Sequence, residues 1–216
     1  MEFRVSGVLL DLDGTLVDST AVVDKHWALV ADHLGLERDE VVGRFHGMTA
    51  DQTMRAIAPS LSEDDHVSLV SDLLAGELGD AGLVTALPGA LELVQQLPED
   101  AWAVVTSGPR ELAAARLEGA GLPVPARMVT ADDVVRGKPD PEPYRRGVEA
   151  LGLEPGQCLA IEDAPPGVRS AVAAGCQVLG VRTTHPELEV PTVLDLSWVS
   201  VAVEGDVLVL SGRQGL

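Results

Sequence analysis

The stretch VLLDLDGTLVDS, residues 8–19, joins an apolar run to two carboxylates that are two residues apart. The run is typical of a buried strand, yet Asp11 and Asp13 would repel each other at its end. Burial of an unpaired carboxylate is also costly. Gly14 lets the backbone turn sharply directly after them. We therefore expect a cation beside these carboxylates, at the end of a buried strand.

Short apolar runs of this kind recur along the chain and alternate with helical patterns. We expect strands at residues 5–10, 101–105, 126–129, 158–161 and 178–181. Helical spacing is found at residues 110–117, 142–151 and 167–174. This alternation predicts an α/β fold, with a doubly wound, Rossmann-like parallel sheet covered by helices on both faces.

One interval, residues 16–84, breaks the alternation. Three amphipathic segments follow one another there, at residues 21–36, 50–58 and 63–78. We expect an inserted helical cap domain at residues 16–84, with hinges at residues 15–18 and 82–87, and an α/β core at residues 1–15 and 85–216. Near the end, alternating runs at residues 199–203 and 207–210 predict a C-terminal β-hairpin at an antiparallel edge.

The composition limits the partners. The 216 residues include 34 acidic and 15 basic side chains, which gives a formal charge of -19. This charge repels nucleic acids and anionic membranes, so neither is an expected partner, but a metal ion could still attract a small anionic substrate locally. Cys158 and Cys176 are expected to be reduced core residues. With neither a signal peptide nor a transmembrane span in the pattern, we expect a cytoplasmic protein. Its expected oligomeric state is a monomer or a weak homodimer.

Polar side chains follow three of the predicted strands, where ligands bind in open parallel sheets. Asp11 and Asp13 follow the first strand, Thr106, Ser107 and Gly108 follow the second, and Glu162 and Asp163 follow the fourth. A lysine motif, Gly137-Lys138-Pro139, precedes the helix that leads into the fourth strand. Carboxylate oxygens are the ligands that Mg²⁺ prefers. The pattern therefore predicts a Mg²⁺ site at this edge of the sheet.

The chemistry that fits these residues is phosphoryl transfer to an aspartate. Asp11 would attack phosphorus, while Lys138 and the metal offset the negative charge of the phosphate. Thr106 and Ser107 would hold phosphate oxygens. Asp13 would protonate the leaving alkoxide and then deprotonate the attacking water.

Four motifs, in this order, resemble those of the haloacid dehalogenase superfamily of aspartate-nucleophile phosphatases. They are DLDGT at 11–15, TSG at 106–108, GKP at 137–139 and IEDA at 161–164. The resemblance implies Asp11 as the nucleophile, Asp13 as acid and base with its backbone carbonyl on Mg²⁺, and Asp163 as a metal ligand. Residues 101–110 and 137–144 are similar to the branch that hydrolyses glycerol phosphate, 2-deoxyglucose 6-phosphate and related sugar or polyol phosphates.

Some assignments stay open. Glu162 either ligates the metal directly or acts on it only through water. Asp132 or Asp133 either joins the metal site or, as we expect, serves a turn or a helix cap. The segment at residues 44–49 is expected to lie over the site, which makes Arg44 and His46 candidate substrate-binding residues.

The predicted function is a Mg²⁺-dependent phosphomonoesterase that acts on a small sugar or polyol phosphate through an aspartyl-phosphate intermediate. One alternative is a phosphosugar mutase of the same family. Such mutases have a cap histidine near Val23 and an arginine near Ala50, and neither is present here. The other is a receiver-like phosphoaspartate signalling module, against which the inserted helical segment argues.

Overall fold

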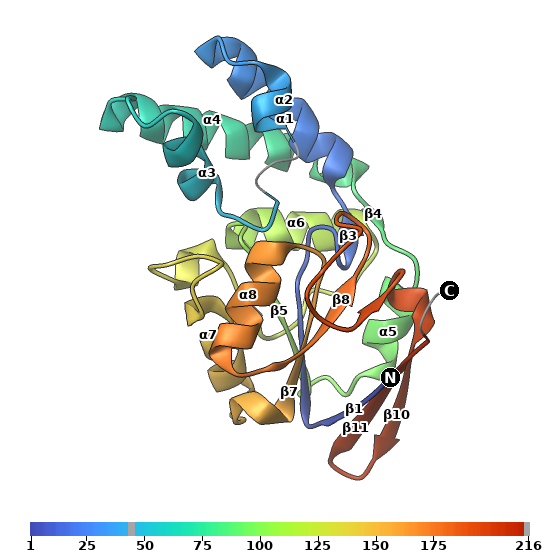
Figure 1. The fold of residues 1–216 in the computed structure, drawn as a ribbon. Coiled ribbons are helices and arrows are strands. Elements are labelled where there is room, and N and C mark those ends of the chain that lie inside the picture. The colour runs from blue at the N-terminus through green and yellow to red at the C-terminus, as the bar shows by residue number, and fades with distance from the viewer. Residues whose placement is uncertain (43–45, 214–216) are drawn as a thin grey trace.

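A six-stranded parallel sheet runs through the centre of the computed structural model, which describes residues 1–42 and 46–213 (Figure 1). The strand order is β6-β5-β2-β7-β8-β9. Their bounds are β2 (Gly7–Leu10), β5 (Trp102–Val105), β6 (Met128–Val129), β7 (Cys158–Glu162), β8 (Gln177–Val181) and β9 (Thr192–Val193). The predicted doubly wound α/β sheet is confirmed. The two-residue β9 was not predicted, because it is too short to show a pattern.

Helices cover both faces of this sheet, and the structure describes two on each. One face carries α5 (Ala90–Gln96) and α6 (Arg110–Gly119), and the other carries α7 (Glu142–Leu151) and α8 (Pro165–Ala174). Successive residues of a strand point to opposite faces, so Leu10 packs with the first pair of helices and Leu9 with the second. Burial on both faces explains why the strands are continuous apolar runs.

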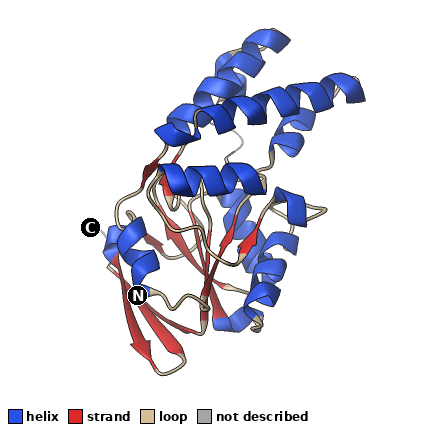
Figure 2. Ribbon diagram, turned by 180° about the vertical axis from the view of Figure 1, so that it is seen from behind, coloured by secondary structure: helices blue, strands red, loops and turns tan. Residues whose placement is uncertain are grey.

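Residues 16–84 are called the helical segment below. Their described part, residues 16–42 and 46–84, contains four α-helices and a short 3₁₀ helix, which lie beyond one end of the sheet (Figures 1 and 2). The helices are α1 (Thr20–Leu34), α2 (Arg38–Val41), α3 (Ala50–Ile57), α4 (Glu63–Gly79) and η1 (Ala81–Leu83). The three predicted helices are α1, α3 and α4, while α2 is additional. Val30, Met54 and Leu73 form a small apolar cluster among them.

The helical segment is connected to the sheet by a two-stranded antiparallel ribbon. Its strands are β3 (Val17–Asp18) and β4 (Thr85–Ala86), so the chain enters and leaves side by side. These strands fall within the two stretches predicted as hinges.

One predicted strand, residues 5–10, is divided in the structure. Residues Glu2–Val5 form β1, and Gly7–Leu10 form β2 in a different sheet. The backbone changes partners at Ser6, whose N–H donates to the carbonyl of Gln157 at 2.8 Å. The apolar pattern does not reveal this change, because both strands have buried residues.

The C-terminal hairpin is confirmed, as β10 (Val199–Glu204) and β11 (Val207–Gly212). The expected antiparallel pairing is found: β11 pairs with β1, and the three strands form an antiparallel sheet that is separate from the six-stranded one. The hairpin thus pairs with β1, the strand that precedes the break at Ser6.

The two cysteines are free, as predicted, but only one is a core residue. Cys158 is buried in β7, whereas Cys176 is half-buried in the turn before β8. Burial raises the pKa of the Cys158 thiol to about 11, so it stays protonated near neutral pH. Within the described part of the chain, no helix has the length and apolar character needed to cross a bilayer.

Candidate active site

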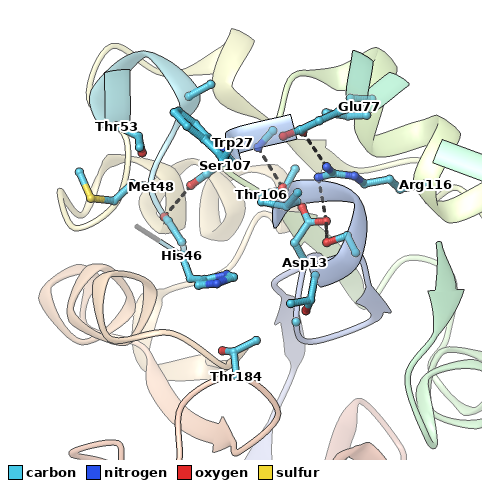
Figure 3. A pocket seen from close by; sticks show the side chains of 18 of the residues that line it. Asp13, Trp27, His46, Met48, Thr53, Glu77, Thr106, Ser107, Arg116 and Thr184 are labelled. Carbon is cyan, nitrogen blue, oxygen red and sulfur yellow. Dashed lines mark hydrogen bonds and ion pairs between the residues drawn. The ribbon is translucent and has the colours of Figure 1, made fainter. Parts of the chain in front are cut away.

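The polar residues predicted at the strand ends do meet at one edge of the sheet. Strands β5, β2, β7 and β8 are neighbours, and their carboxyl ends lead into Thr106, Asp11, Asp163 and Thr184. A cavity of about 110 Å³ lies between this edge and the helical segment. Residues of both parts line it, among them Asp11 from the sheet side. Figure 3 labels Asp13 and Thr106 from the sheet side and Trp27, Thr53 and Glu77 from the helices.

Lys138 is fully buried beside this cavity and contacts two carboxylates. Its Nζ lies 2.6 Å from Asp11 Oδ1 and 2.6 Å from Glu162 Oε1, and it also donates to the Val105 carbonyl at 3.0 Å. Burial opposes the charge of the ammonium group, but attraction to Asp11 and Glu162 outweighs it and raises the pKa of Lys138. The lysine is therefore a fixed positive charge.

Each carboxylate oxygen of Glu162 accepts hydrogen bonds from two donors. Its Oε1 accepts from Lys138 and from the Tyr144 hydroxyl, the latter at 2.9 Å. Its Oε2 accepts from the backbone N–H groups of Asp163 at 3.1 Å and Ala164 at 3.3 Å. Tyr144 was not singled out from the sequence. These contacts hold Glu162 in one orientation and make it an anchor for Lys138.

Three buried carboxylates form an acidic cluster. One oxygen from each of Asp11, Glu162 and Asp163 lies within 4.8 Å of the others. Burial and then repulsion from Glu162 raise the pKa of Asp11 to about 7, although Lys138 opposes this. Burial and then repulsion from Asp11 also raise the pKa of Asp163. Three carboxylates against one ammonium leave negative charge that a hard divalent cation would offset.

Asp163 is held by two threonines that were not predicted from the sequence. The Thr184 hydroxyl donates to Asp163 Oδ2, and the Thr15 hydroxyl lies 3.5 Å from Oδ1. Gly14, with a φ of 86°, brings the backbone so close that a Cβ there would overlap the Asp163 carboxylate. The turn after β2 and the end of β8 therefore fix Asp163 together.

Asp13 lies apart from the acidic cluster and has partners of its own. Its Oδ1 accepts from the Ser19 hydroxyl at 2.7 Å and from Arg116 Nη1 at 2.8 Å. Arg116 Nη2 donates to Glu77 Oε2 at 2.7 Å (Figure 3). Arg116 belongs to α6 and Glu77 to α4, so this chain of ion pairs joins the helical segment to the sheet side of the cavity.

Arg116 and Glu77 were missed in the sequence analysis, although a signal exists. The buried face of α6 contains Leu112, Ala113 and Leu117, and Arg116 falls on it. On α4, Glu77 is buried one turn after Leu73. A charged residue at a position that the helical period assigns to the core requires a buried partner. Burial also raises the pKa of Glu77, and Arg116 opposes this rise.

The predicted phosphate-binding residues lie on the loop after β5. Thr106 is buried, and its Oγ1 accepts from the Gly108 N–H at 3.1 Å. The Ser107 hydroxyl donates to the carbonyl of Gly47, in the helical segment, at 2.9 Å. All three residues line the cavity. The Thr106 hydroxyl, which accepts from Gly108 and keeps its own proton, and the backbone N–H of Ser107 are suitable donors to an anion.

Of the two predicted residues from the helical segment, His46 lines the cavity. Its ring lies edge-on to that of His185, with 6.2 Å between the centroids. Arg44 lies outside the described residues.

Three further acidic residues, Asp132, Asp133 and Asp18, accept hydrogen bonds in turns or at helix starts. Asp132 accepts from the N–H of Arg110 at 2.8 Å, at the start of α6. Asp133 accepts from the hydroxyl of Thr130 at 2.8 Å in a capping turn. Asp18 is exposed and accepts from the N–H of Thr20 at 3.2 Å. These contacts confirm the turn and cap roles preferred for Asp132 and Asp133.

Comparisons with known proteins agree with this geometry. Residues 5–175 match the family described as haloacid dehalogenase-like hydrolase. The chain is 42% identical to hexitol phosphatase A of Escherichia coli, over 95% of this chain and 99% of that protein. It is 30% identical to glycerol-1-phosphate phosphohydrolase 2 of Saccharomyces cerevisiae, over 85% of this chain and 77% of that protein.

A solved structure with a similar fold is the β-phosphoglucomutase of Clostridium difficile. Its TM-score is 0.80 at 19% identity, and the match covers 89% of this chain and 92% of that one. Identity at this level demonstrates a shared fold and does not distinguish a phosphatase from a mutase.

Proposed function

The chain belongs to the haloacid dehalogenase-like hydrolase family, and on this premise we propose that it is a Mg²⁺-dependent phosphomonoesterase of small sugar or polyol phosphates. The observation that supports this most directly is the Lys138 ammonium between Asp11 and Glu162, beside a cavity that could receive a phosphate. The polyol phosphatases among the relatives support the substrate class.

The residues of the acidic cluster suit a Mg²⁺ ion. Asp11, Asp163 and the backbone carbonyl of Asp13 would hold it, all of them hard oxygen ligands. Glu162 already accepts from four donors, so we assign it to positioning Lys138 rather than to the metal. When bound, the ion supplies positive charge that offsets the charge of the phosphate and of the carboxylates.

The first chemical step belongs to Asp11. Lys138 holds Oδ1 of this carboxylate, and we assign the attack on phosphorus to the other oxygen, Oδ2. A bond forms from that oxygen to phosphorus while the bond from phosphorus to the substrate oxygen breaks. The Thr106 hydroxyl and the backbone N–H of Ser107 would donate to the phosphoryl oxygens as charge develops on them. The N–H of Gly108, which donates to Thr106 Oγ1, would orient that hydroxyl.

The proton transfers belong to Asp13. Its carboxyl group would give a proton to the departing alkoxide, and would then take a proton from the water that attacks the aspartyl phosphate. The second attack releases inorganic phosphate and restores Asp11. Ser19 and Arg116 fix the Asp13 side chain on the cavity wall, which is where the leaving-group oxygen would lie.

The lining of the cavity favours this proposal over a phosphosugar mutase. A mutase must also bind the second phosphate of a bisphosphate intermediate. Val23 and Ala50, where related mutases have a histidine and an arginine, both line the cavity. An apolar and a small side chain there provide no charge for a second phosphate.

We also propose that the helical segment acts as a cap. It carries His46, Trp27 and Glu77 to the cavity, and the two-stranded ribbon of β3 and β4 is its connection to the sheet. Its closure would exclude bulk water from the phosphate and bring the leaving-group contacts into place.

The experiment that tests the function is phosphate release by wild type and by Asp11→Asn. With p-nitrophenyl phosphate and with a panel of sugar and polyol phosphates, wild type should be active only with Mg²⁺. Asp11→Asn should lose activity by at least about a thousandfold, because the amide is no nucleophile. Asp18→Asn is the matched control, since Asp18 is exposed and outside the cluster, and it should keep its activity. Comparable activity in Asp11→Asn would refute the proposed mechanism.

A further inference from the structure

A pair of buried, oppositely charged side chains lines the cavity beyond Asp13. Arg116 bridges Asp13 and Glu77 through Nη1 and Nη2, and the side chains of Arg116 and Glu77 are only 4% and 7% exposed (Figure 3). Asp13 is the group that would handle the leaving-group oxygen. Arg116 and Glu77 are therefore placed where the rest of the leaving group would lie.

The hydrogen-bonding capacity of this pair is not fully used. Arg116 Nε is buried and has no partner among the residues that the structure describes. Glu77 binds Arg116 through Oε2, and in residues 1–42 and 46–213 no donor to its Oε1 is found. Because Arg116 Nε is enclosed by protein, the capacity left to a ligand is the Glu77 Oε1 acceptor. A hydroxyl group can donate to that oxygen.

The charge of this group of residues is unfavourable to an anion. Two carboxylates, Asp13 and Glu77, share the single guanidinium of Arg116. The helical part of the lining also includes Trp27, Thr53 and Leu74, which are uncharged. When Asp13 carries the proton that it gives to the leaving group, Glu77 still offsets the charge of Arg116. A carboxylate or a second phosphate on the leaving group would therefore find no uncompensated cation there and would be repelled by the Glu77 carboxylate in a poorly solvated cavity.

We propose that Glu77, held by Arg116, restricts the leaving-group end of the cavity to uncharged, hydroxyl-bearing groups. This assignment rests on the proposed phosphatase function and names the feature of the leaving group that the enzyme selects. Glu77 would accept a hydrogen bond from a hydroxyl of the leaving group and would repel a carboxylate at the same position.

The test compares two substrates of one carbon skeleton. Glycerol 1-phosphate has an uncharged leaving group, and 3-phosphoglycerate has a carboxylate in place of a terminal hydroxymethyl group. Wild type should prefer the first by about a hundredfold in kcat/KM, as expected for a like charge at close range. Equal kcat/KM values for the two substrates in wild type would overturn the proposal by themselves, before any variant is measured.

The decisive variant is Glu77→Gln, which keeps an acceptor for Arg116 and removes the charge. Its preference for glycerol 1-phosphate should fall by at least about tenfold. Glu77→Asp keeps the charge and should retain the preference. Asp72→Asn removes a charge from an exposed position of the same helix and serves as the matched control. An unchanged preference in a folded Glu77→Gln protein would refute the assignment.

Activity on p-nitrophenyl phosphate separates this inference from the function on which it rests. If wild type shows no Mg²⁺-dependent phosphate release from that compound, or Asp11→Asn retains it, the proposed function fails. If those tests succeed and Glu77→Gln still discriminates as wild type does, only the role of Glu77 fails. Thermal denaturation of each variant establishes that the protein compared is folded.

Discussion

The Lys138 ammonium lies 2.6 Å from the Asp11 carboxylate, and the two side chains are 0% and 7% exposed. Such a pair is sensitive to the removal of either partner, because the remaining charge stays buried without compensation. Glu162 belongs to the same contact, so the lysine compensates two carboxylates at once. The lysine that we propose to contact the phosphate therefore also compensates buried negative charge in the folded chain.

We expect Lys138→Met to lower the free energy of unfolding by about 3 kcal/mol or more, since it leaves Asp11 and Glu162 buried without their cation. The variant should also lose phosphatase activity. Urea denaturation and phosphate release measure the two effects. In the control, Lys25→Met, an exposed ion pair with Asp80 is lost, which should cost about 1 kcal/mol or less. Equal losses in both variants would contradict this prediction.

The effect of Mg²⁺ on stability should depend on pH. The pKa of Asp11 is raised to about 7 in the protein, above its ordinary value of about 3.9. The folded chain therefore keeps this proton longer than the unfolded chain. Without metal, the Asp11 contribution to the free energy of unfolding should fall as pH rises between these values.

Metal binding requires ionised ligands, so protons compete with Mg²⁺ over the same range. We expect saturating Mg²⁺ to raise the Tm more at about pH 8 than at about pH 5. Thermal scans with Mg²⁺ and with a chelator measure this difference. An equal rise at both values would show that the acidic cluster does not bind the metal.

Gly14→Ala should disrupt the site through the position of Asp163. A Cβ at Gly14 would overlap the Asp163 carboxylate and lie 2.8 Å from Thr184 Cγ2. Gly35 has a similar backbone conformation, with φ of 67°, but a Cβ there meets nothing within 4 Å. Both substitutions carry backbone strain of about 1 kcal/mol. We expect only Gly14→Ala to abolish activity and the Mg²⁺-dependent rise in Tm.

Arg116 and Glu77 should be energetically coupled. Arg116→Met leaves Glu77 and Asp13 without their cation, so we expect a loss of about 3 kcal/mol in the free energy of unfolding. In a Glu77→Gln background the same substitution should cost about 1 to 2 kcal/mol less, because one buried charge is already absent. A double-mutant cycle in urea measures the coupling. If the losses in the free energy of unfolding were strictly additive, the proposed coupling between Arg116 and Glu77 would be wrong.

The fold was predictable where a local pattern specifies an element. Strands buried on both faces are apolar runs, and helices α6 and α7 repeat their apolar residues at helical spacing. The break at Ser6 was not predictable in this way. Val5 and Gly7 both continue an apolar pattern, and only their partners, Leu208 and Cys158, assign them to different sheets. Those partners lie far away in the sequence.

The same distinction applies to the site. Asp11, Asp163 and Lys138 could be named because their motifs follow or flank predicted strands, whose ends must meet. Arg116 and Glu77 lie inside helices, and their contact depends on how the helical segment packs against α6. A buried charge on an apolar helix face signals that a partner exists but does not identify it.

The small apolar cluster of Val30, Met54 and Leu73 is separate from the two clusters that pack against the sheet. Substitutions in it would alter the roof of the cavity while the packing that aligns Asp11 with Lys138 stays intact. Under the proposed function, residues of the helical segment that do not contact Asp13 or Arg116 can therefore change selectivity without altering catalysis. A chain built in this way can acquire new substrates through changes in residues 16–84 without a new catalytic apparatus.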